Sequence, residues 1–456
     1  RFPMMVIEAV RNAVGKDFPI EMRISTEECI SSDKRLPLDD VITFIQHAEP
    51  YIDIVNCSRG LDMIREANIH HAATIFEPHI TNLEALRKIR ANTSCLLSVV
   101  GSIMTPEEAE SLLEEGSADL IMLGRSTLAD PFWPVKAQMG HSEDIVPCIR
   151  CLQCYHVSTD HKNVQCSVNP RFNREKRVPL MLPVTGHPKH LVIVGGGPAG
   201  ITCALTASRR GHQVTLLEKE PVLTGKLNIA CHGEHKADLR RFRDYLLTQL
   251  RKSSVTVHTG VLADTDVVRD LKPDALVIAV GATPSRIPLP GVDGDNCMQI
   301  SEFLQSPDTS LQHYIIIGGG SVGCETALDL AEKGKDVSII EMADCLASAS
   351  NDLYRLALSE HFARYDNLHT YLNSACQSID ADGVNVLTNG ASTHISGDKV
   401  LLSLGFRPDA KQVSSLYGIV PDTYYVGDCE RVATVAEAVN NAYFIGANVF
   451  QEQDII

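Results

Sequence analysis

CIRCLQCYHVSTDHKNVQCSVNP, residues 148–170, contains four cysteines: Cys148, Cys151, Cys154 and Cys166. The first three recur at every third position, and the fourth follows after eleven intervening residues. A tight loop of this kind can wrap three thiolates around one corner of a metal cluster while a returning segment supplies the fourth, as a [4Fe–4S] cluster requires. A structural zinc site also takes four cysteines, but it usually shows two separated C-x-x-C pairs. The spacing therefore favours an iron–sulfur cluster over zinc.

The bulk composition is that of an ordinary globular protein. The chain has 456 residues, of which 44% are hydrophobic and 21% charged, and this length predicts about three domains. The formal net charge of −16 argues against nucleic acid or an anionic membrane as a partner, because few cations are available to neutralise phosphates. Of the 14 cysteines, those outside the stretch above are scattered singly, which indicates a reducing compartment such as the cytoplasm. Neither a secretory signal nor a membrane helix is visible, and a homo-oligomer is compatible with this composition.

Strands and helices alternate through the first 140 residues. Helices are expected at 4–14, 38–47 and 83–90 and after a capping box at Thr105–Glu108, and strands at 18–25, 52–56, 96–100 and 119–123. This succession predicts parallel strands. Four strand–helix units are too few for an eight-stranded barrel, so we interpret them as the C-terminal half of a (βα)8 TIM barrel. The chain begins with Arg1 rather than Met, and we expect it to be part of a longer polypeptide.

Two loops of this half-barrel have the composition of a phosphate site. Gly101–Ser102 and Gly124–Arg125 follow the strands that would be the seventh and eighth of the barrel, where phosphates usually bind in this fold. Glycine lets the backbone approach a phosphate, and the arginine guanidinium offers two parallel, positively charged N–H donors. The alternative for Arg125 is an ordinary solvated position at a helix start.

Other polar side chains of the half-barrel are weaker candidates. Arg23 lies within a strand with Glu21 on the same face, and a charge there is costly unless it meets a ligand or a partner. Arg23 is therefore a candidate to face the electron-rich edge of a cofactor, with an internal Arg23–Glu21 pair as the alternative. His70 and His71 lie in the long loop after the second strand and could touch substrate, but we expect them to be exposed.

One pattern occurs twice after a linker at 171–189 that is rich in Pro, Arg and Lys. In each copy, an apolar strand is followed by a glycine-rich turn and the start of a helix: LVIVGGGPAG (191–200) and YIIIGGGSVG (314–323). A second strand follows each and ends in a carboxylate, Glu218 or Glu341, 23 positions after the first glycine of the motif. The motif glycines are Gly195, Gly197 and Gly200 in the first copy and Gly318, Gly320 and Gly323 in the second.

Each copy follows an apolar strand, opens a helix and is followed by a second strand that ends in a carboxylate. In this context G-x-G-x-x-G indicates a dinucleotide site. The glycines allow a tight turn and the close approach of a pyrophosphate to a helix N-terminus, and the carboxylate accepts from ribose hydroxyls. Two copies imply two dinucleotides, and Glu341 favours NADH over NADPH at the second because a carboxylate repels a 2′-phosphate. Near the C-terminus, Gly427 and Asp428 follow a short apolar strand, so Asp428 could reach the ribityl or pyrophosphate region of a flavin. A plain turn aspartate is the alternative.

Taken in order, these motifs resemble a known family. The matching stretches are CIRCLQC with its fourth cysteine and NP, GRSTLADP (124–131), GGGPAG with LLEKE, AVGATP, GGGSVG and YYVGDC. They are similar to the 2,4-dienoyl-CoA reductase and enoate reductase-like NADH:flavin oxidoreductases, whose barrel is an old-yellow-enzyme module. The resemblance implies a barrel that holds FMN, a [4Fe–4S] cluster beside it, and an FAD domain interrupted by an NAD(P)H domain.

The resemblance also assigns residues. Arg23 would contact the FMN ring and ribityl, and the FMN phosphate would be held by Gly101, Ser102, Gly124 and Arg125. The cluster would be ligated by Cys148, Cys151, Cys154 and Cys166. FAD would be bound by Gly195, Gly197, Gly200, Glu218, Gly427 and Asp428, and the nicotinamide nucleotide by Gly318, Gly320, Gly323 and Glu341. The implied domains are a partial FMN barrel at 1–140, the iron–sulfur loop and linker at 141–187, FAD at 188–287 and 405–456, and NAD(P)H at 288–404.

The predicted activity is NADH-dependent reduction of a C=C bond conjugated to a carbonyl or thioester of a small molecule. Electrons would pass from NADH through FAD, the cluster and FMN to the substrate. An amine dehydrogenase of the same architecture is the alternative that the C-x-x-C-x-x-C spacing favours, although the complete second glycine motif counts against it. A diaphorase-like electron-transfer module is a third interpretation. No residue of this chain can be assigned the proton-donating acid, which the resemblance places in the first half of the barrel, and the substrate is not identified.

Overall fold

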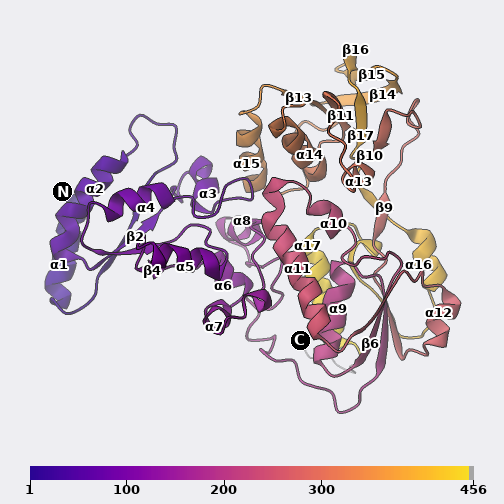
Figure 1. The fold of residues 1–456 in the computed structure, drawn as a ribbon, viewed down its shortest axis with the longest axis horizontal. Coiled ribbons are helices and arrows are strands. Elements are labelled where there is room, and N and C mark those ends of the chain that lie inside the picture. The colour runs from indigo at the N-terminus through magenta and orange to yellow at the C-terminus, as the bar shows by residue number, and fades with distance from the viewer. Residues whose placement is uncertain (451–456) are drawn as a thin grey trace. The chain divides into compact units, whose positions relative to one another are not determined.

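The structure, a computed structural model, describes residues 1–450 (Figure 1). The chain divides into two compact units, Arg1–Tyr155 and His156–Ile456. Both units combine helices with parallel sheets, so the predicted α/β class is confirmed. Among the described residues, no helix is both long enough and apolar enough to cross a membrane.

The first unit is built on a four-stranded parallel sheet in the order β1-β2-β3-β4. Its strands are β1 (Glu21–Ser25), β2 (Ile54–Ser58), β3 (Leu96–Val99) and β4 (Leu120–Ile121). Its helices are α1 (Phe2–Val14), α2 (Leu38–Ala48), α3 (Arg65–His71), α4 (Leu83–Arg90), α5 (Pro106–Glu114), α6 (Arg125–Ala129) and α7 (Trp133–Gln138). Helix α8 (Gln153–Thr159) follows at the boundary between the units. Each strand is followed by helix before the next, which is the half-barrel succession expected from the sequence.

The core of this unit lies between the sheet and its helices. Val55 and Leu97 are fully buried on the central strands, against Ile45 and Leu86 of the helices. The capping box at the start of α5 is confirmed, since the Thr105 side chain accepts from the Glu108 N–H and the Glu108 carboxylate accepts from the Thr105 N–H. This reciprocal bonding satisfies two of the free N–H groups of the first turn.

Helix α3 is one of the elements that were not predicted from the sequence. Its sequence, REANIHH, has no apolar helical repeat, and no side chain caps it at Ile64. It is stabilised instead by burial of Ala67, Asn68 and Ile69. Tertiary packing, rather than local propensity, commonly decides such short helices.

The second unit contains two parallel sheets. The first has the order β19-β8-β5-β6-β7. Its strands are β5 (His190–Val194), β6 (Gln213–Glu218), β7 (Thr256–Thr259), β8 (Ala275–Ile278) and β19 (Thr423–Tyr425), and its helices are α9 (Pro198–Arg209), α10 (Leu227–Ala230), α11 (Ala237–Lys252), α12 (Thr265–Asp270), α16 (Ala410–Leu416) and α17 (Val435–Asn448). Helix α9 packs on β5 and β6, and α11 and α17 pack against α9 (Figure 1).

The second parallel sheet of this unit has the order β10-β17-β11-β12-β13 and is accompanied by the antiparallel sheet β14-β15-β16. Their strands are β10 (Cys297–Gln299), β11 (His313–Ile317), β12 (Asp336–Ile340), β13 (Leu368–Tyr371), β14 (Ser374–Asp380), β15 (Gly383–Thr388), β16 (Ala391–Ser396) and β17 (Lys399–Leu402), with helices α13 (Ile300–Phe303), α14 (Ser321–Glu332) and α15 (Asp352–Phe362). The whole stretch lies between β9 (Ala282–Pro284) and β18 (Phe406–Pro408), which pair with each other antiparallel. One Rossmann-like sheet is thus nested within the chain of the other, as predicted.

Candidate cofactor-binding sites

The first glycine-rich turn joins β5 to α9 and requires glycine at some of its positions. Gly195 has φ +113°, and a Cβ there would lie 2.2 Å from the carbonyl oxygen of Ala279. A Cβ at Gly200 would lie 1.9 Å from the carbonyl oxygen of Gly195. At Gly197, the N-cap of α9, a Cβ would meet nothing within 4 Å, so this side of the turn is open to a ligand. The turn therefore fits a dinucleotide pyrophosphate approaching the helix N-terminus.

Glu218 at the end of β6 is held against this turn. Its two carboxylate oxygens accept from the N–H groups of Gly196, at 2.7 Å, and Glu220, at 2.9 Å. Gly196 was not among the residues predicted from the sequence, yet a Cβ there would lie 2.5 Å from Leu223 and 3.1 Å from the Glu218 carboxylate. The signal was the middle glycine of the GGG run, a position at which the G-x-G-x-x-G motif accepts any residue. The backbone bonds fix the carboxylate and leave its other lone pairs for ribose hydroxyls.

The second glycine-rich turn, between β11 and α14, repeats this arrangement. The Glu341 carboxylate accepts from the N–H groups of Gly319, at 2.6 Å, and Ala343, at 2.7 Å. Gly318 has φ +105°, and a Cβ there would lie 2.3 Å from the carbonyl oxygen of Ser403. Gly320 is open, as Gly197 is in the first copy. A Cβ at the last motif glycine, Gly323, would lie 2.3 Å from the Gly318 carbonyl oxygen.

The Gly427–Asp428 segment lies beside the first turn. It forms the 3-10 helix η4 (Gly427–Cys429) after β19. A Cβ at Gly427 would lie 3.0 Å from the Cβ of Ala199 in the first turn of α9. The Asp428 carboxylate accepts from the Ala433 N–H at 3.1 Å and pairs with the Lys226 ammonium. The structure therefore brings Asp428 to the candidate FAD site.

In the first unit, the structure brings two of the four predicted phosphate residues into direct contact. The Arg125 guanidinium donates to the Ser102 hydroxyl at 2.7 Å and to the Ala73 carbonyl oxygen at 2.9 Å. Arg125 is therefore tied to the body of the unit rather than solvated at a helix start. A Cβ at Gly124 would meet nothing within 4 Å, whereas one at Gly101 would lie 2.9 Å from the Asn82 side chain. An anchored arginine beside a hydroxyl and an open glycine fits a phosphate group.

A row of polar side chains crosses the strands of the half-barrel, and most of it was not predicted from the sequence. Glu21 on β1 accepts from the Asn56 amide at 2.8 Å and the Ser98 hydroxyl at 2.7 Å, and these bonds, that of Ser98 first, lower the pKa of Glu21. Arg23 is exposed and stands opposite Asn56 in the strand register. The Asn56 Oδ1 atom is buried and has no hydrogen-bond partner among residues 1–450, so it is available to a ligand. The signal was a polar residue in each of three successive strands: Glu21 at the start of β1, Asn56 at the centre of β2 and Ser98 within β3.

The expected exposure of His70 and His71 is wrong. His70 is mostly buried and its Nδ1 atom bonds to the Glu77 carboxylate. His71 is half-buried and stacks on the Tyr155 ring, with centroids 6.0 Å apart. Burial, followed by the nearby charge of Arg23, lowers the pKa of His71. These histidines are part of the packing of α3.

The loop that carries the first three predicted cluster ligands has an unusual backbone. Arg150 and Leu152, which alternate with the cysteines, have φ of +45° and +58°. The Arg150 N–H donates to the Cys148 Sγ at 3.4 Å. The Arg150 guanidinium donates to the carbonyl oxygens of Thr74, at 2.7 Å, and Glu77, at 2.8 Å. Positive φ at these two positions makes the loop turn tightly, and the contacts of Arg150 fix the turn to the body of the first unit.

The chemistry of these thiols suits a metal cluster. All 14 cysteines are free, and burial raises the pKa of Cys148 to about 12 and also raises that of Cys154. Thiolates in such a place need a bound cation. The fourth predicted ligand, Cys166, belongs to the second unit, where its carbonyl oxygen accepts from the Asn440 amide of α17 at 3.2 Å.

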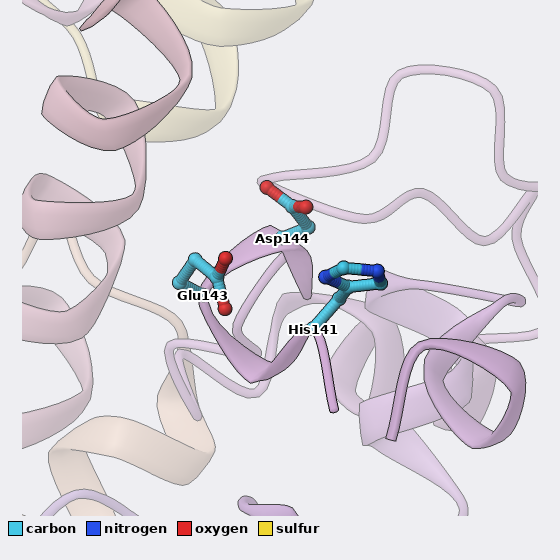
Figure 2. Close-up of side chains that lie close together, drawn as sticks. All are labelled: His141, Glu143 and Asp144. Carbon is cyan, nitrogen blue, oxygen red and sulfur yellow. The ribbon is translucent and has the colours of Figure 1, made fainter. Parts of the chain in front are cut away.

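A further group of side chains has metal-ligand chemistry. Figure 2 shows His141, Glu143 and Asp144 around the 3-10 helix η2 (Ser142–Asp144), and their ligand atoms lie within 4.8 Å of one another. His141 and Glu143 are exposed, and exposed groups of this kind are common without an ion. We assign no metal to them.

Comparisons with known proteins match two parts of the chain to two different families. Residues 189–442 match the model of the pyridine nucleotide-disulphide oxidoreductase family, and residues 1–144 match that of the NADH:flavin oxidoreductase / NADH oxidase family. The NADH oxidase of Thermoanaerobacter brockii is 32% identical over 97% of this chain and 68% of its own length. The bilirubin reductase of Mediterraneibacter gnavus is 30% identical over 98% of this chain and 70% of its own.

A solved structure extends the similarity to the fold. A 2-naphthoyl-CoA reductase in complex with 2-naphthoyl-CoA matches 98% of this chain and 68% of its own, with a TM-score of 0.91 and 26% identity. Its match, like those of the two relatives, runs across both units. The chain therefore belongs to the 2,4-dienoyl-CoA reductase-like NADH:flavin oxidoreductases, which join an FMN-type barrel to a pyridine nucleotide-disulphide oxidoreductase module.

Proposed function

We propose that this protein is an NADH-dependent flavin and iron–sulfur oxidoreductase that reduces a C=C bond conjugated to a carbonyl or thioester of a small molecule. The observation that carries this proposal is the presence of two complete dinucleotide turns, each with an open glycine and a carboxylate fixed by backbone N–H groups. They fit FAD and NADH, and the Ser102–Arg125 pair fits the phosphate of FMN. When bound, the flavins supply hydride chemistry and a [4Fe–4S] cluster supplies single-electron transfer.

The residues of the chain bind and orient these groups. In this proposal, FAD is held by Gly195, Gly197, Gly200, Glu218, Gly427 and Asp428, NADH by Gly318, Gly320, Gly323 and Glu341, FMN by Arg23, Gly101, Ser102, Gly124 and Arg125, and the cluster by Cys148, Cys151, Cys154 and Cys166. The FMN part spans 1–140, the iron–sulfur loop and linker 141–187, the FAD domain 188–287 and 405–456, and the NADH domain 288–404. The antiparallel pairing of β9 with β18 near the last two boundaries supports the division. The free cysteines support a cytoplasmic location.

The proposed reaction is tested by anaerobic turnover of the full-length protein. We expect NADH oxidation to require an unsaturated acceptor, such as cinnamate or an enoyl thioester, and to match the saturated product formed. Product analysis by mass spectrometry and NADH absorbance give the two quantities. Oxidation of an amine with electron export would favour the dehydrogenase alternative, and activity with dyes alone would favour the diaphorase alternative.

Glu341 is expected to set the preference for NADH. In Glu341→Gln, the amide must turn its NH₂ towards one of two backbone N–H donors, and the charge that repels a 2′-phosphate is lost. We expect KM for NADH to rise by about tenfold and discrimination against NADPH to fall, with kcat little changed. Steady-state kinetics with both nucleotides and a dye acceptor measure this. Glu218→Gln, the matched change in the first copy, is the control and should leave KM for NADH unchanged.

A further inference from the structure

Three segments of the chain meet at the N-terminal end of α9. One is the glycine-rich turn itself. The second contains Gly225, at which a Cβ would lie 3.5 Å from the Cα of Gly197. The third contains Gly427, which approaches Ala199 as described above. The residues that follow these last two glycines, Lys226 and Asp428, carry opposite charges.

The Asp428 carboxylate lies beside a site for an anion. A dinucleotide diphosphate carries negative charge, and a second negative charge next to it is repelled. One carboxylate oxygen of Asp428 accepts from the Ala433 N–H, and the other pairs with the Lys226 ammonium. The Lys226 and Asp428 side chains are 30% and 19% exposed, so water screens them only in part. The ammonium also lies 4.2 Å from the centre of the Phe406 ring, which helps to fix its position.

The second dinucleotide turn indicates that this lysine is not needed to build the fold. Thr224 and Ala347 occupy equivalent places, because each has positive φ and donates its N–H at 2.7 Å to the carbonyl oxygen of the middle glycine. Two positions further on, the first copy has Lys226 and the second has Ala349. The same turn is thus made with and without the lysine. The lysine occurs in the copy that is approached by Asp428.

We propose that Lys226 is a charge-balancing residue of the FAD site, which neutralises Asp428 so that the FAD diphosphate can bind beside it. The proposal rests on the proposed function for the identity of the dinucleotide. It predicts a specific dependence between two residues. Lys226 is important for FAD binding while Asp428 is charged, and loses most of its importance once Asp428 is neutral.

A double-mutant cycle tests this dependence. FAD is removed from the full-length protein, and its dissociation constant is measured by flavin fluorescence for wild type, Lys226→Met, Asp428→Asn and the double variant. We expect Lys226→Met to weaken FAD binding by about tenfold, the size of a partly screened repulsion, and the loss to shrink at high salt. The double variant should bind FAD about as well as Asp428→Asn alone. Lys226→Arg, which keeps the charge, should bind nearly as wild type.

The control is Lys333→Met, which removes another ion-paired lysine, bonded to Asp329 at 2.7 Å on α14. It should leave FAD binding unchanged. The midpoint of thermal unfolding and the FMN content are measured for every variant. If the role of Lys226 were purely structural, both quantities would fall together with FAD affinity, and they would fall in Lys226→Arg as well. Equal FAD affinity in Lys226→Met and wild type, or independent losses in the double variant, would overturn the proposal. Failure of the wild-type protein to bind FAD would instead overturn the assigned cofactor.

Discussion

Replacing Cys148 with alanine is expected to stop the reduction of FMN by NADH while FAD is still reduced. Alanine removes one of the three predicted sulfur ligands from this tightly turned loop. The effect should exceed about a hundredfold, since even mutation of residues outside the ligand shell of a metal commonly costs 10- to 100-fold. Anaerobic stopped-flow absorbance separates the two flavins when the FAD-depleted and FMN-depleted proteins are measured as references.

The matched control is Cys345→Ala, which removes a partly exposed cysteine outside the cluster stretch. It should retain wild-type iron and wild-type FMN reduction, whereas Cys148→Ala should lose iron and acid-labile sulfide. Undiminished FMN reduction without iron would contradict the assigned electron path. Zinc in place of iron and sulfide in the wild-type protein would contradict the cluster itself.

Two alanine substitutions in one glycine motif should affect different properties: Gly318→Ala should reduce stability, whereas Gly320→Ala should reduce NADH binding. In Gly318→Ala, a Cβ would lie 2.3 Å from the Ser403 carbonyl oxygen in a residue with φ +105°. We expect a loss of about 3 kcal/mol or more in the free energy of unfolding of this part of the chain. In Gly320→Ala, the Cβ meets nothing, so stability should change by less than about 1 kcal/mol. Its Cβ would nevertheless occupy the space that a pyrophosphate needs, so NADH binding should fall sharply.

Urea unfolding and NADH titration distinguish the two variants. Gly195→Ala and Gly197→Ala provide the same pair in the first copy, where FAD binding rather than NADH binding should respond. A Gly320→Ala variant that binds NADH as tightly as wild type would show that the nucleotide does not approach this turn. A Gly318→Ala variant of wild-type stability would mean that the turn can rearrange.

The dinucleotide turns could be predicted in detail because their signal is local. A strand, a glycine run and a helix follow one another directly, and the carboxylate comes at a fixed distance along the chain. What the sequence could not indicate was the pairing of Glu218 with the Gly196 N–H, or of Lys226 with Asp428, which are 202 positions apart. Contacts of that range depend on how the sheets bring separate loops together.

The half-barrel was harder to predict at the level of its site. Its strands and most of its helices follow hydrophobic periodicity, but α3 is stabilised by tertiary burial and has no local signal. The histidines on α3 were therefore placed wrongly. The polar row of Glu21, Asn56 and Ser98 joins three strands that are distant in sequence, so no single motif reveals it.

The pairing of β9 with β18 has a consequence for how such a chain can be assembled. The chain leaves the FAD-type sheet through β9 and returns through β18, and these two strands lie next to each other. The whole segment between them therefore begins and ends at neighbouring points of the FAD-type domain. Another nucleotide-binding domain could replace this segment without changing the path of the host chain, provided that its own two ends lie close together.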